Sequence, residues 1–217
     1  MVGLLGLFFL SDGFYVHTVA VSGLQTLTRE EVFALTDVAD YHLFWVDPST
    51  VQANLIASPT INEADVRLGW PPQMVRITIQ EREPVLIWEQ GGTATWIDLQ
   101  GRAMELRQDR SNLVRIAYQG LASATLEPDD TIPADVVNGA LQLRELLVDI
   151  EQLNYSPDKG LGFRDGRGWD AWFGTGTDMP NKALVYNALV ERLLARGIQP
   201  TLVSVGDAEH PYYSTQP

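Results

Sequence analysis

The sequence predicts an α+β fold in two domains, and three observations lead to this prediction. Residues 14–83 carry, in order, one strand pattern, two short helix patterns and two more strand patterns, with capping or turn residues at every joint. Residues 84–217 carry short, spaced strand patterns and two longer helix patterns, which indicates a mixed or antiparallel β-sheet domain with two packing helices. A chain of 217 residues can fill one large core or two modest ones.

The first strand and the first helix are predicted by local chemistry. Within residues 14–23, Val19 and Val21 alternate with polar or small neighbours, and the run stops at Gly23, as a half-buried strand should. Thr28 is an N-cap residue, and Glu31 stands three positions later, where its carboxylate completes a capping box. A short helix is therefore expected over residues 30–35.

The second helix and a hairpin complete the first domain. Asp47 is placed to cap a helix whose first position is a proline, and Pro59 cannot continue it. Residues 64–68 and 75–79 then alternate with period two, and a glycine and proline cluster at 69–72 separates them. These two runs are expected to form a hairpin with one apolar face.

The second domain is expected to contain strands bounded by glycine-rich turns. Two hairpins stand out, one around the Gly-Gly pair at 91–92 and one around the charged, glycine-bearing turn at 164–168. The expected strands cover residues 85–88, 94–97, 112–118, 161–163, 169–173 and 201–205.

Two helices are expected in the same domain. One starts at Pro133 and the other covers residues 180–196, with Gly197 placed to end it. The core-facing residues recur at spacings of three and four, and they are Val136, Ala140, Leu143, Leu147 and Ile150 in the first helix and Val185, Leu189 and Leu193 in the second.

This ordered set of landmarks resembles the POTRA domain of the bacterial cell-division proteins FtsQ and DivIB. Residues 66–71 and 77–84 resemble the segment by which that family enters its second, β-rich domain, and residues 96–101, Gly174, Lys182 and the strand at 201–205 resemble parts of that second domain. The resemblance implies a POTRA domain over residues 14–83 and an FtsQ-type β-domain over residues 84–217. The matching POTRA residues are Phe14, Val16, Val19, Val21, Gly23, Thr28, Val32, Pro59, Ile61, Ala64 and Val66.

Residues 1–10 are apolar or glycine and carry no charge, whereas a membrane-spanning helix needs about twenty such residues. The family has one transmembrane helix just before the POTRA strand, so the resemblance implies that residues 1–13 are the C-terminal part of a truncated transmembrane anchor. A signal segment or a buried strand is the alternative. No Lys or Arg precedes Leu10, so the orientation comes from the resemblance alone. It implies a single-pass cell-membrane protein at the division septum, with its C-terminal bulk extracytoplasmic.

Composition excludes several classes of function. The formal charge of −13 would repel nucleic-acid phosphate, so no nucleic-acid partner is expected. The chain has no cysteine, which excludes a disulfide, a thiolate metal site and a cysteine nucleophile. His17, His42 and His210 stand in different predicted elements, without metal-ligand spacing. We expect no metal and no cofactor.

Candidate catalytic motifs are weak. Asp98 is expected to bond its own backbone in a turn, and residues 174–178 lack the Lys-Ser/Thr pair of a phosphate loop. An extracytoplasmic hydrolase would need a nucleophile and a base in one cleft, for which Asp98 and His210 are the candidates. We expect no catalytic residue, no enzyme activity and no small-molecule substrate.

The expected function is partner binding at a sheet edge, where an extended segment can pair with unpaired backbone groups. The resemblance implies that the C-terminal edge of the β-domain receives FtsB, which acts with FtsL, and that FtsW and FtsI are further divisome partners. Tyr212 and Tyr213 are the candidate anchors, or they simply cover the sheet end. The candidate edge residues are Leu202, Val203, Val205, Pro211, Tyr212 and Tyr213.

A second candidate surface lies in the POTRA domain at Val66, Arg67, Leu68 and Arg76. Alternation places Val66 and Leu68 on one strand face, which favours core packing, whereas the two arginines are expected to face solvent or an acidic partner.

The sequence thus leads to a non-enzymatic divisome scaffold that binds FtsB and FtsL outside the membrane and helps regulate septal peptidoglycan synthesis. The alternative is a POTRA-type polypeptide-binding module of a protein transport or outer-membrane assembly system. That alternative predicts tandem POTRA repeats or barrel strands, and neither pattern is visible in the sequence.

Overall fold

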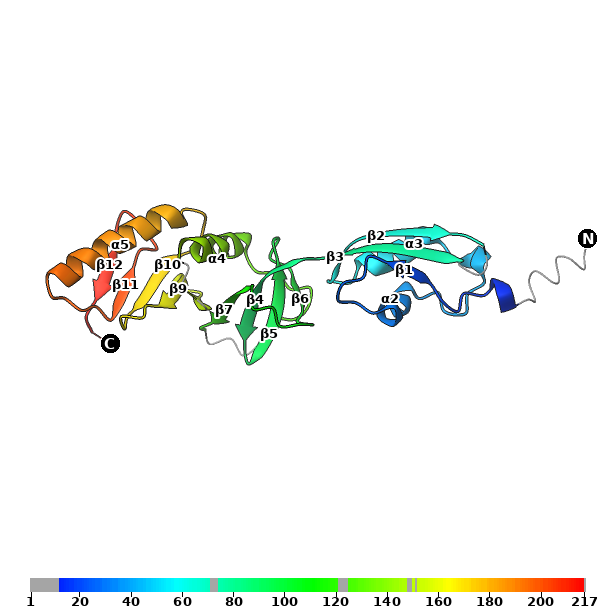
Figure 1. Cartoon of the computed structure of the whole chain (residues 1–217), viewed down its shortest axis with the longest axis horizontal. Coiled ribbons are helices and arrows are strands. Elements are labelled where there is room, and N and C mark those ends of the chain that lie inside the picture. Colours follow the sequence, from blue (N-terminus) through cyan, green and yellow to red (C-terminus); the bar gives the residue numbers. More distant parts are fainter. Residues whose placement is uncertain (1–11, 71–73, 121–124, 148–149, 151, 217) are drawn as a thin grey trace, which may run out of the picture. The chain divides into compact units, whose positions relative to one another are not determined.

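A computed structural model describes residues 12–70, 74–120, 125–147, 150 and 152–216. The chain divides into two compact units, which we call the N-terminal unit (Met1–Arg82) and the C-terminal unit (Glu83–Pro217) (Figure 1). Each has its own sheet and helices, so the predicted α+β class is confirmed.

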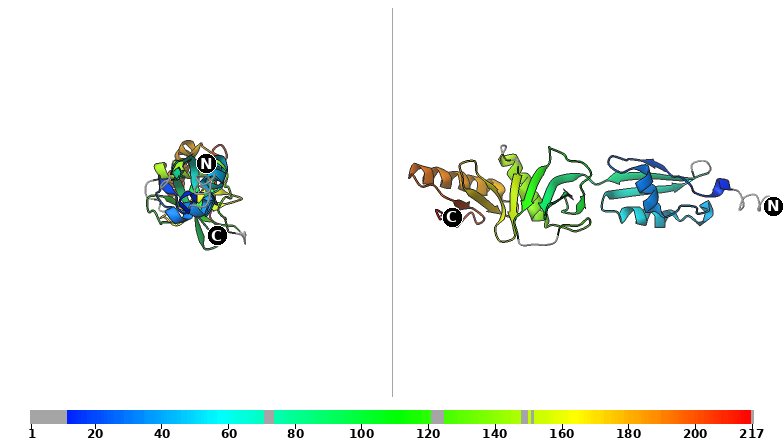
Figure 2. Two further views of the ribbon diagram at one scale, coloured as in Figure 1. Left: turned by 90° about the vertical axis from the view of Figure 1, so that its right-hand side faces the viewer. Right: turned by 90° about the horizontal axis from the view of Figure 1, so that it is seen from below.

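The N-terminal unit has the predicted order of strand, helix, helix, strand and strand. Its sheet has the order β1-β3-β2, with β3 parallel to β1 and antiparallel to β2. The 3₁₀ helix η1 lies at one tip of the unit (Figures 1 and 2). The elements are η1 (Asp12–Phe14), β1 (Ala20–Ser22), α2 (Arg29–Thr36), η2 (Leu43–Trp45), α3 (Pro48–Ile56), β2 (Ile61–Leu68) and β3 (Val75–Glu81).

Caps define the two α-helices as predicted. The Glu31 amide donates to the Thr28 hydroxyl at 3.2 Å, and the Thr28 amide donates to the Glu31 carboxylate at 2.7 Å, which together form the capping box. Asp47 accepts from the Ser49 amide at 3.1 Å, and Pro48 occupies the first turn of α3. The predicted helix starts are therefore confirmed.

The sheet of the N-terminal unit has one buried face. Burial alternates along β3, where Val75, Ile77 and Ile79 are buried while their neighbours are exposed. The buried side chains belong to the same core cluster as Val32 of α2 and Leu55 of α3. The helices therefore cover one face of the sheet and leave the other to solvent.

A buried carboxylate ties the loop after β1 to the end of β3. Glu81 accepts from the amides of Gln25, Thr26 and Leu27 at 2.7–3.0 Å and from the Thr26 hydroxyl at 2.5 Å. Burial by itself would raise the pKa of Glu81, but these hydrogen bonds to the ionised form outweigh it and lower the pKa. The loop after β1 is thus held on an ionised side chain.

The C-terminal unit is built on one nine-stranded sheet with the order β12-β11-β10-β9-β8-β7-β4-β5-β6. The pairs β4/β7, β7/β8 and β10/β11 are parallel and the others are antiparallel, so the sheet is mixed. The elements are β4 (Pro84–Gln90), β5 (Thr93–Asp98), β6 (Ala103–Glu105), β7 (Val114–Tyr118), α4 (Ala134–Leu146), β8 (Gln152–Ser156), β9 (Gly160–Arg164), β10 (Asp170–Gly174), α5 (Met179–Ala195), β11 (Leu202–Ser204) and β12 (Tyr212–Ser214).

Both predicted hairpins are confirmed, because β4 pairs antiparallel with β5 and β9 with β10. Three strands that the sequence analysis did not predict complete the sheet, namely β6, β8 and β12. The strand β8 lies between β7 and β9, so it joins the two halves of the sheet. The helices α4 and α5 lie along one side of the sheet (Figure 1).

The core-facing stripes of the two helices differ in part from the prediction. In α4 the side chains of Val136, Ala140 and Leu143 are buried as predicted, but Leu147 is already the C-cap residue and Ile150 lies beyond the helix. In α5 only Leu193 of the predicted stripe is buried, whereas Val185 and Leu189 pack at the margin of the core. The buried face of α5 is formed by Met179, Lys182, Ala183, Tyr186, Val190 and Leu193.

Candidate partner-binding edge

The two borders of the nine-stranded sheet differ in what lies beside them. At one border, the chain covers β6 itself, because the Ala103 amide donates to the Asp130 carbonyl at 2.8 Å and the Asp129 amide donates to the Ala103 carbonyl at 2.9 Å. At the other border, no described strand pairs with the outer side of β12. β12 is therefore the edge at which a partner strand could pair.

The candidate edge residues of β11 lie inside the sheet. β11 pairs with β10 on one side, in parallel, and with β12 on the other, antiparallel. The side chains of Val203 and Val205 are fully buried in the core, and Leu202 is half-buried. The outermost strand is thus β12, since the chain turns back after β11 and pairs with it. The open edge of the sheet is therefore formed by residues 212–214 and not by residues 202–205.

Tyr212 and Tyr213 lie on the outermost strand and point to opposite faces of the sheet. Tyr213 stands opposite Val203, on the face that the helices cover, and Tyr212 stands opposite Ser204, on the other face. Their exposed fractions are 55% for Tyr212 and 43% for Tyr213. A strand added beside β12 would therefore meet an aromatic side chain on each face. Pro211, directly before β12, is half-buried.

A groove of about 430 Å³ opens beside Tyr212. Its wall includes Tyr155 and Lys159 from the region of the β8–β9 turn, and Asp135 from the start of α4. The ammonium of Lys159 also lies 5.3 Å from the centre of the Trp172 ring, in cation–π geometry. The groove offers apolar and charged side chains next to the open edge.

Two loops hold the edge in place. The Thr201 amide donates to the Ser214 carbonyl at 2.7 Å, and the Thr201 hydroxyl donates to the Gln216 carbonyl at 2.7 Å. In the loop before β12, the His210 ring lies 3.0 Å from the Asp207 carboxylate. This contact with His210 lowers the pKa of Asp207.

A buried lysine supports the turn between β10 and α5, near the same edge. The Lys182 ammonium donates to the Thr175 carbonyl at 2.9 Å. Burial lowers the pKa of Lys182, while the carboxylates of Asp178 and Asp207 act in the opposite direction. The glycine-rich segment before α5 is thus a strand-to-helix turn tied down by a side chain.

The candidate POTRA residues lie on β2 and β3. Val66 is partly buried against the core, and Leu68 is partly exposed at the end of β2. Arg67 is exposed and pairs with Asp65 at 2.8 Å, and Arg76 stands directly opposite Arg67 across the two strands. Val66 is thus in part a packing residue, whereas both arginines reach solvent.

The candidate catalytic pair is not brought together. Asp98 accepts from the amides of Gln100 and Arg102 at 2.9 Å each, which is a turn role. His210 contacts Asp207 instead. Five strands lie between β5 and β11 in the sheet, which separates Asp98 from His210 by on the order of 25–30 Å.

The other two histidines have structural contacts. His17 lies 3.1 Å from Asp40 at the surface, and His42 is buried and accepts from the Phe44 amide at 3.3 Å. In the part of the chain that the structure describes, no cluster of three or more His, Asp or Glu side chains could hold a metal ion.

The expected membrane anchor, residues 1–13, lies outside the described residues except for Asp12 and Gly13. None of the helices formed by residues 12–216, where these are described, is both long and apolar enough to cross a bilayer.

Comparison with known proteins identifies the fold of the N-terminal unit. Residues 14–82 match the family described as POTRA domain, FtsQ-type. The chain is 28% identical over 155 residues to the cell division protein FtsQ of Chloroflexus aurantiacus, which covers 70% of this chain and 57% of that protein. It is 28% identical over 179 residues to FtsQ of Chloroflexus aggregans, which covers 81% of this chain and 61% of that protein.

A third relative, the cell division protein FtsQ of Streptomyces griseus, is 29% identical over 192 residues, covering 81% of this chain and 87% of that protein. The chain spans 57% and 61% of the length of the two Chloroflexus relatives. An alignment over 81% of the chain extends beyond the N-terminal unit into the C-terminal unit. Residues 14–82 therefore form an FtsQ-type POTRA domain, and the chain is similar to bacterial cell division proteins named FtsQ over most of its length.

Proposed function

We propose that this chain is a non-enzymatic scaffold of the division machinery that binds FtsB, acting with FtsL, and so helps regulate septal peptidoglycan synthesis. FtsW and FtsI would be further partners of the same assembly. We also propose that the region of residues 1–13 belongs to a membrane anchor and that the C-terminal bulk is extracytoplasmic, at the septum. The POTRA domain and the similarity to FtsQ proteins support a role in cell division, and the geometry of the C-terminal unit supports partner binding by strand addition.

The observation that carries this proposal is the outer side of β12, which pairs with none of the described strands and is flanked by two exposed tyrosines. A strand edge left without a partner offers alternate N–H and C=O groups to an extended peptide, which gives affinity through the main chain. Tyr212 and Tyr213 can then select the peptide through its side chains on both faces of the sheet. β12 itself is only three residues long, so the side chains must contribute much of the specificity.

Strand addition at β12 can be tested with the whole chain and the extracytoplasmic segment of the cognate FtsB. Tyr212→Asp and Tyr213→Asp should each weaken binding roughly tenfold, because each removes an aromatic anchor and brings a charge to the interface. Affinity is measured by isothermal titration calorimetry. Ile56→Asp is the matched control, since Ile56 is an apolar side chain that is 40% exposed at the end of α3 in the other unit.

Hydrogen exchange provides a second readout that is specific for strand pairing. Amides of residues 212–216 should gain protection when the FtsB segment is added, whereas amides of β11, already paired on both sides, should change little. If both aspartate variants keep their fold and the wild-type affinity, β12 is not the binding site.

The POTRA-type transport module receives less support from the geometry. Such a module would be expected in tandem copies, but the described part of the C-terminal unit is a single nine-stranded sheet with two helices.

A further inference from the structure

A cluster of exposed apolar side chains lies at one tip of the N-terminal unit, and neither the core nor the proposed FtsB site uses it. We call it the aromatic tip. Its members come from η2 with the residues just before it, and from the end of β2 with the turn that follows. They are Tyr41, Phe44, Trp45, Leu68 and Trp70, and all are exposed. Exposed apolar side chains gathered in one region mark an interaction site.

The two tryptophans set the aromatic tip apart from the rest of the chain. Trp45 is 77% exposed and Trp70 is 71% exposed. The other four of the six tryptophans lie in the C-terminal unit and are 5% exposed or less. Exposing most of a large aromatic ring to water is unfavourable, so two such rings in one region indicate a binding surface.

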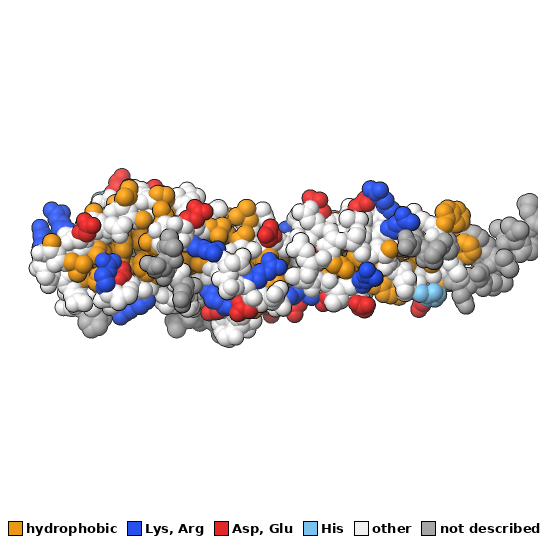
Figure 3. Space-filling model, in the orientation of Figure 1, with side chains coloured by type: hydrophobic (Ala, Val, Ile, Leu, Met, Phe, Trp, Pro, Cys, Tyr) orange, Lys and Arg blue, Asp and Glu red, His pale blue; other side chains and the backbone are white. Residues whose placement is uncertain are grey.

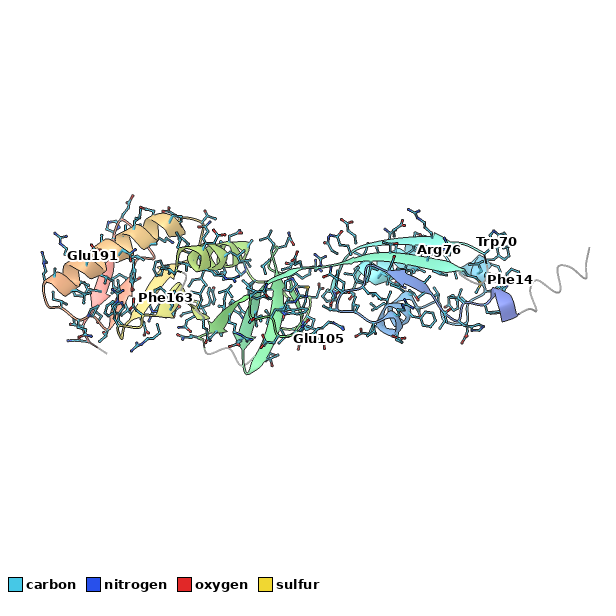
Figure 4. The ribbon with its side chains drawn as sticks, in the orientation of Figure 1. Phe14, Trp70, Arg76, Glu105, Phe163 and Glu191 are labelled. Carbon is cyan, nitrogen blue, oxygen red and sulfur yellow. The ribbon has the colours of Figure 1, made fainter. Side chains whose placement is uncertain are left out.

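The two segments of the aromatic tip meet in space. Phe44 from η2 and Leu68, Gly69 and Trp70 from the β2 side line one groove of about 330 Å³. Figure 4 shows Trp70 and Phe14 at the same tip, and Figure 3 shows hydrophobic side chains gathered there. The tip is therefore one surface formed by two segments.

The same tip receives the N-terminal end of the described chain. The Phe14 ring of η1 stacks on His42 with 6.1 Å between ring centres, and His42 stacks on Phe44 at 5.5 Å. Residues 1–10, which carry no charged side chain, precede η1 by a single residue. An uncharged apolar segment therefore joins the unit directly beside its exposed aromatic side chains.

Charges near the aromatic tip also fit a lipid headgroup. Leu68 pairs with Val75, and one step further along the strands Arg67 stands opposite Arg76. Arg67 forms an ion pair with Asp65. Arg76, labelled in Figure 4, is exposed and has no ion pair with any described residue. A guanidinium near the boundary of an apolar surface can bind a phosphate oxygen of a phospholipid.

We propose that the aromatic tip seats the N-terminal unit in the headgroup region of a lipid bilayer. Trp and Tyr prefer this region because their rings are apolar and their N–H and O–H groups stay hydrated. A partner protein could also cover an apolar surface, but the apolar segment that enters at this tip favours lipid as the occupant. This inference does not depend on FtsB binding at β12, which lies in the other unit.

Tryptophan quenching by brominated lipid tests the proposal with the whole chain. Vesicles of phosphatidylcholine are compared with vesicles of its bromine-labelled form, which quenches only nearby rings. Trp45 and Trp70 should be quenched, whereas the four buried tryptophans of the C-terminal unit should not. Residues 1–11 contain no tryptophan, so their own insertion gives no quenching signal.

Variants then assign the contact. Trp45→Ser and Trp70→Ser should each remove part of the quenching and lower vesicle partitioning roughly tenfold. Leu184→Ser is the matched control, because Leu184 is an exposed apolar side chain in α5 of the other unit and should leave both readouts unchanged. All three positions are exposed, so circular dichroism should show native folds.

Two outcomes would overturn the proposal. In the first, the chain floats with the vesicles but Trp45 and Trp70 remain unquenched, which would mean that residues 1–11 bind alone and the tip stays in water. In the second, the two tryptophans are shielded from acrylamide only when divisome peptides are added, which would make a protein the occupant. The titration of FtsB against the tyrosine variants is unaffected by either result.

Discussion

Single side chains determine how the hairpin β9–β10 is held against α5. Asp165, in the turn of that hairpin, accepts from the Tyr186 hydroxyl at 2.6 Å, and Arg167 binds the same carboxylate through Nε at 2.8 Å and Nη2 at 2.7 Å. Trp169 donates to the Tyr186 oxygen at 2.9 Å and lies under the Arg167 guanidinium. Burial raises the pKa of Tyr186, whereas the hydrogen bonds from Arg167 lower the pKa of Asp165 to about 2 despite its burial.

Asp165 should therefore make stability depend on pH. Its pKa falls from 3.8 in the unfolded chain to about 2 in the folded one, so its contribution is fully present above the unfolded value and is lost as the pH falls through the folded one. Asp165→Asn should lower the free energy of unfolding by roughly 2 kcal/mol at neutral pH. In this variant the free energy of unfolding should also fall less steeply as the pH is lowered. Urea unfolding followed by tryptophan fluorescence measures both effects.

The exposed Asp158→Asn serves as the control for this prediction and should behave as wild type. An Asp165→Asn protein that keeps the wild-type dependence of stability on pH would show that the carboxylate contributes nothing through its charge.

At the scale of elements, close backbone approach decides how β1 joins the sheet of the N-terminal unit. Gly23 follows β1 with φ at +87°, and a Cβ there would lie 1.9 Å from the Ile79 carbonyl oxygen of β3. Only glycine fits both the left-handed backbone and the space. The loop after Gly23 then reaches the Glu81 carboxylate, so the glycine and the carboxylate act on the same connection.

Gly23→Ala should destabilise the N-terminal unit by about 3 kcal/mol, because a strained φ and a steric clash add. Gly92→Ala is the matched control, since Gly92 also has a positive φ, of +82°, but nothing within 4 Å of an added Cβ. The control substitution should lower the free energy of unfolding by only about 1 kcal/mol. Thermal unfolding by circular dichroism compares them, and equal losses would contradict a steric role for Gly23.

The sequence predicted elements with strong local signals and missed those without them. The starts of α2 and α3 were predictable because Thr28, Glu31 and Asp47 satisfy backbone donors only a few residues away. β8 was missed because its five residues include only one fully buried side chain, Leu153. Such a strand is stabilised by its two neighbours in the sheet rather than by its own pattern.

The rotation of α5 was missed for a related reason. The predicted stripe contains only aliphatic residues, whereas Tyr186 and Lys182, which carry polar groups, are also buried on the core face. Tyr186 is tolerated there because Trp169 and Asp165 pair with its hydroxyl, and these partners come from elsewhere in the chain.

At the scale of the whole molecule, the two units have separate cores. The core cluster of the N-terminal unit shares no residue with the two clusters of the C-terminal unit. A unit with its own core and its own complete sheet should fold without the other. The proposed sites are divided in the same way, with the aromatic tip in one unit and β12 in the other.

A fragment of residues 83–217 should therefore fold and bind the FtsB segment as tightly as the whole chain does. Calorimetry compares the two proteins, with the Tyr212→Asp form of the fragment as the negative control. A fragment that is folded but does not bind would place part of the FtsB site in the N-terminal unit.

The sequence by itself determined the α+β class, the caps, the turns and the β-α-α-β-β order, because hydrogen bonds and turn geometry between near neighbours specify them. The tertiary structure alone decided which strand is outermost, which face of α5 is buried and that two distant segments form one exposed aromatic surface. These features depend on pairing and packing between residues far apart in the chain, and no local pattern specifies which distant strands and side chains come together.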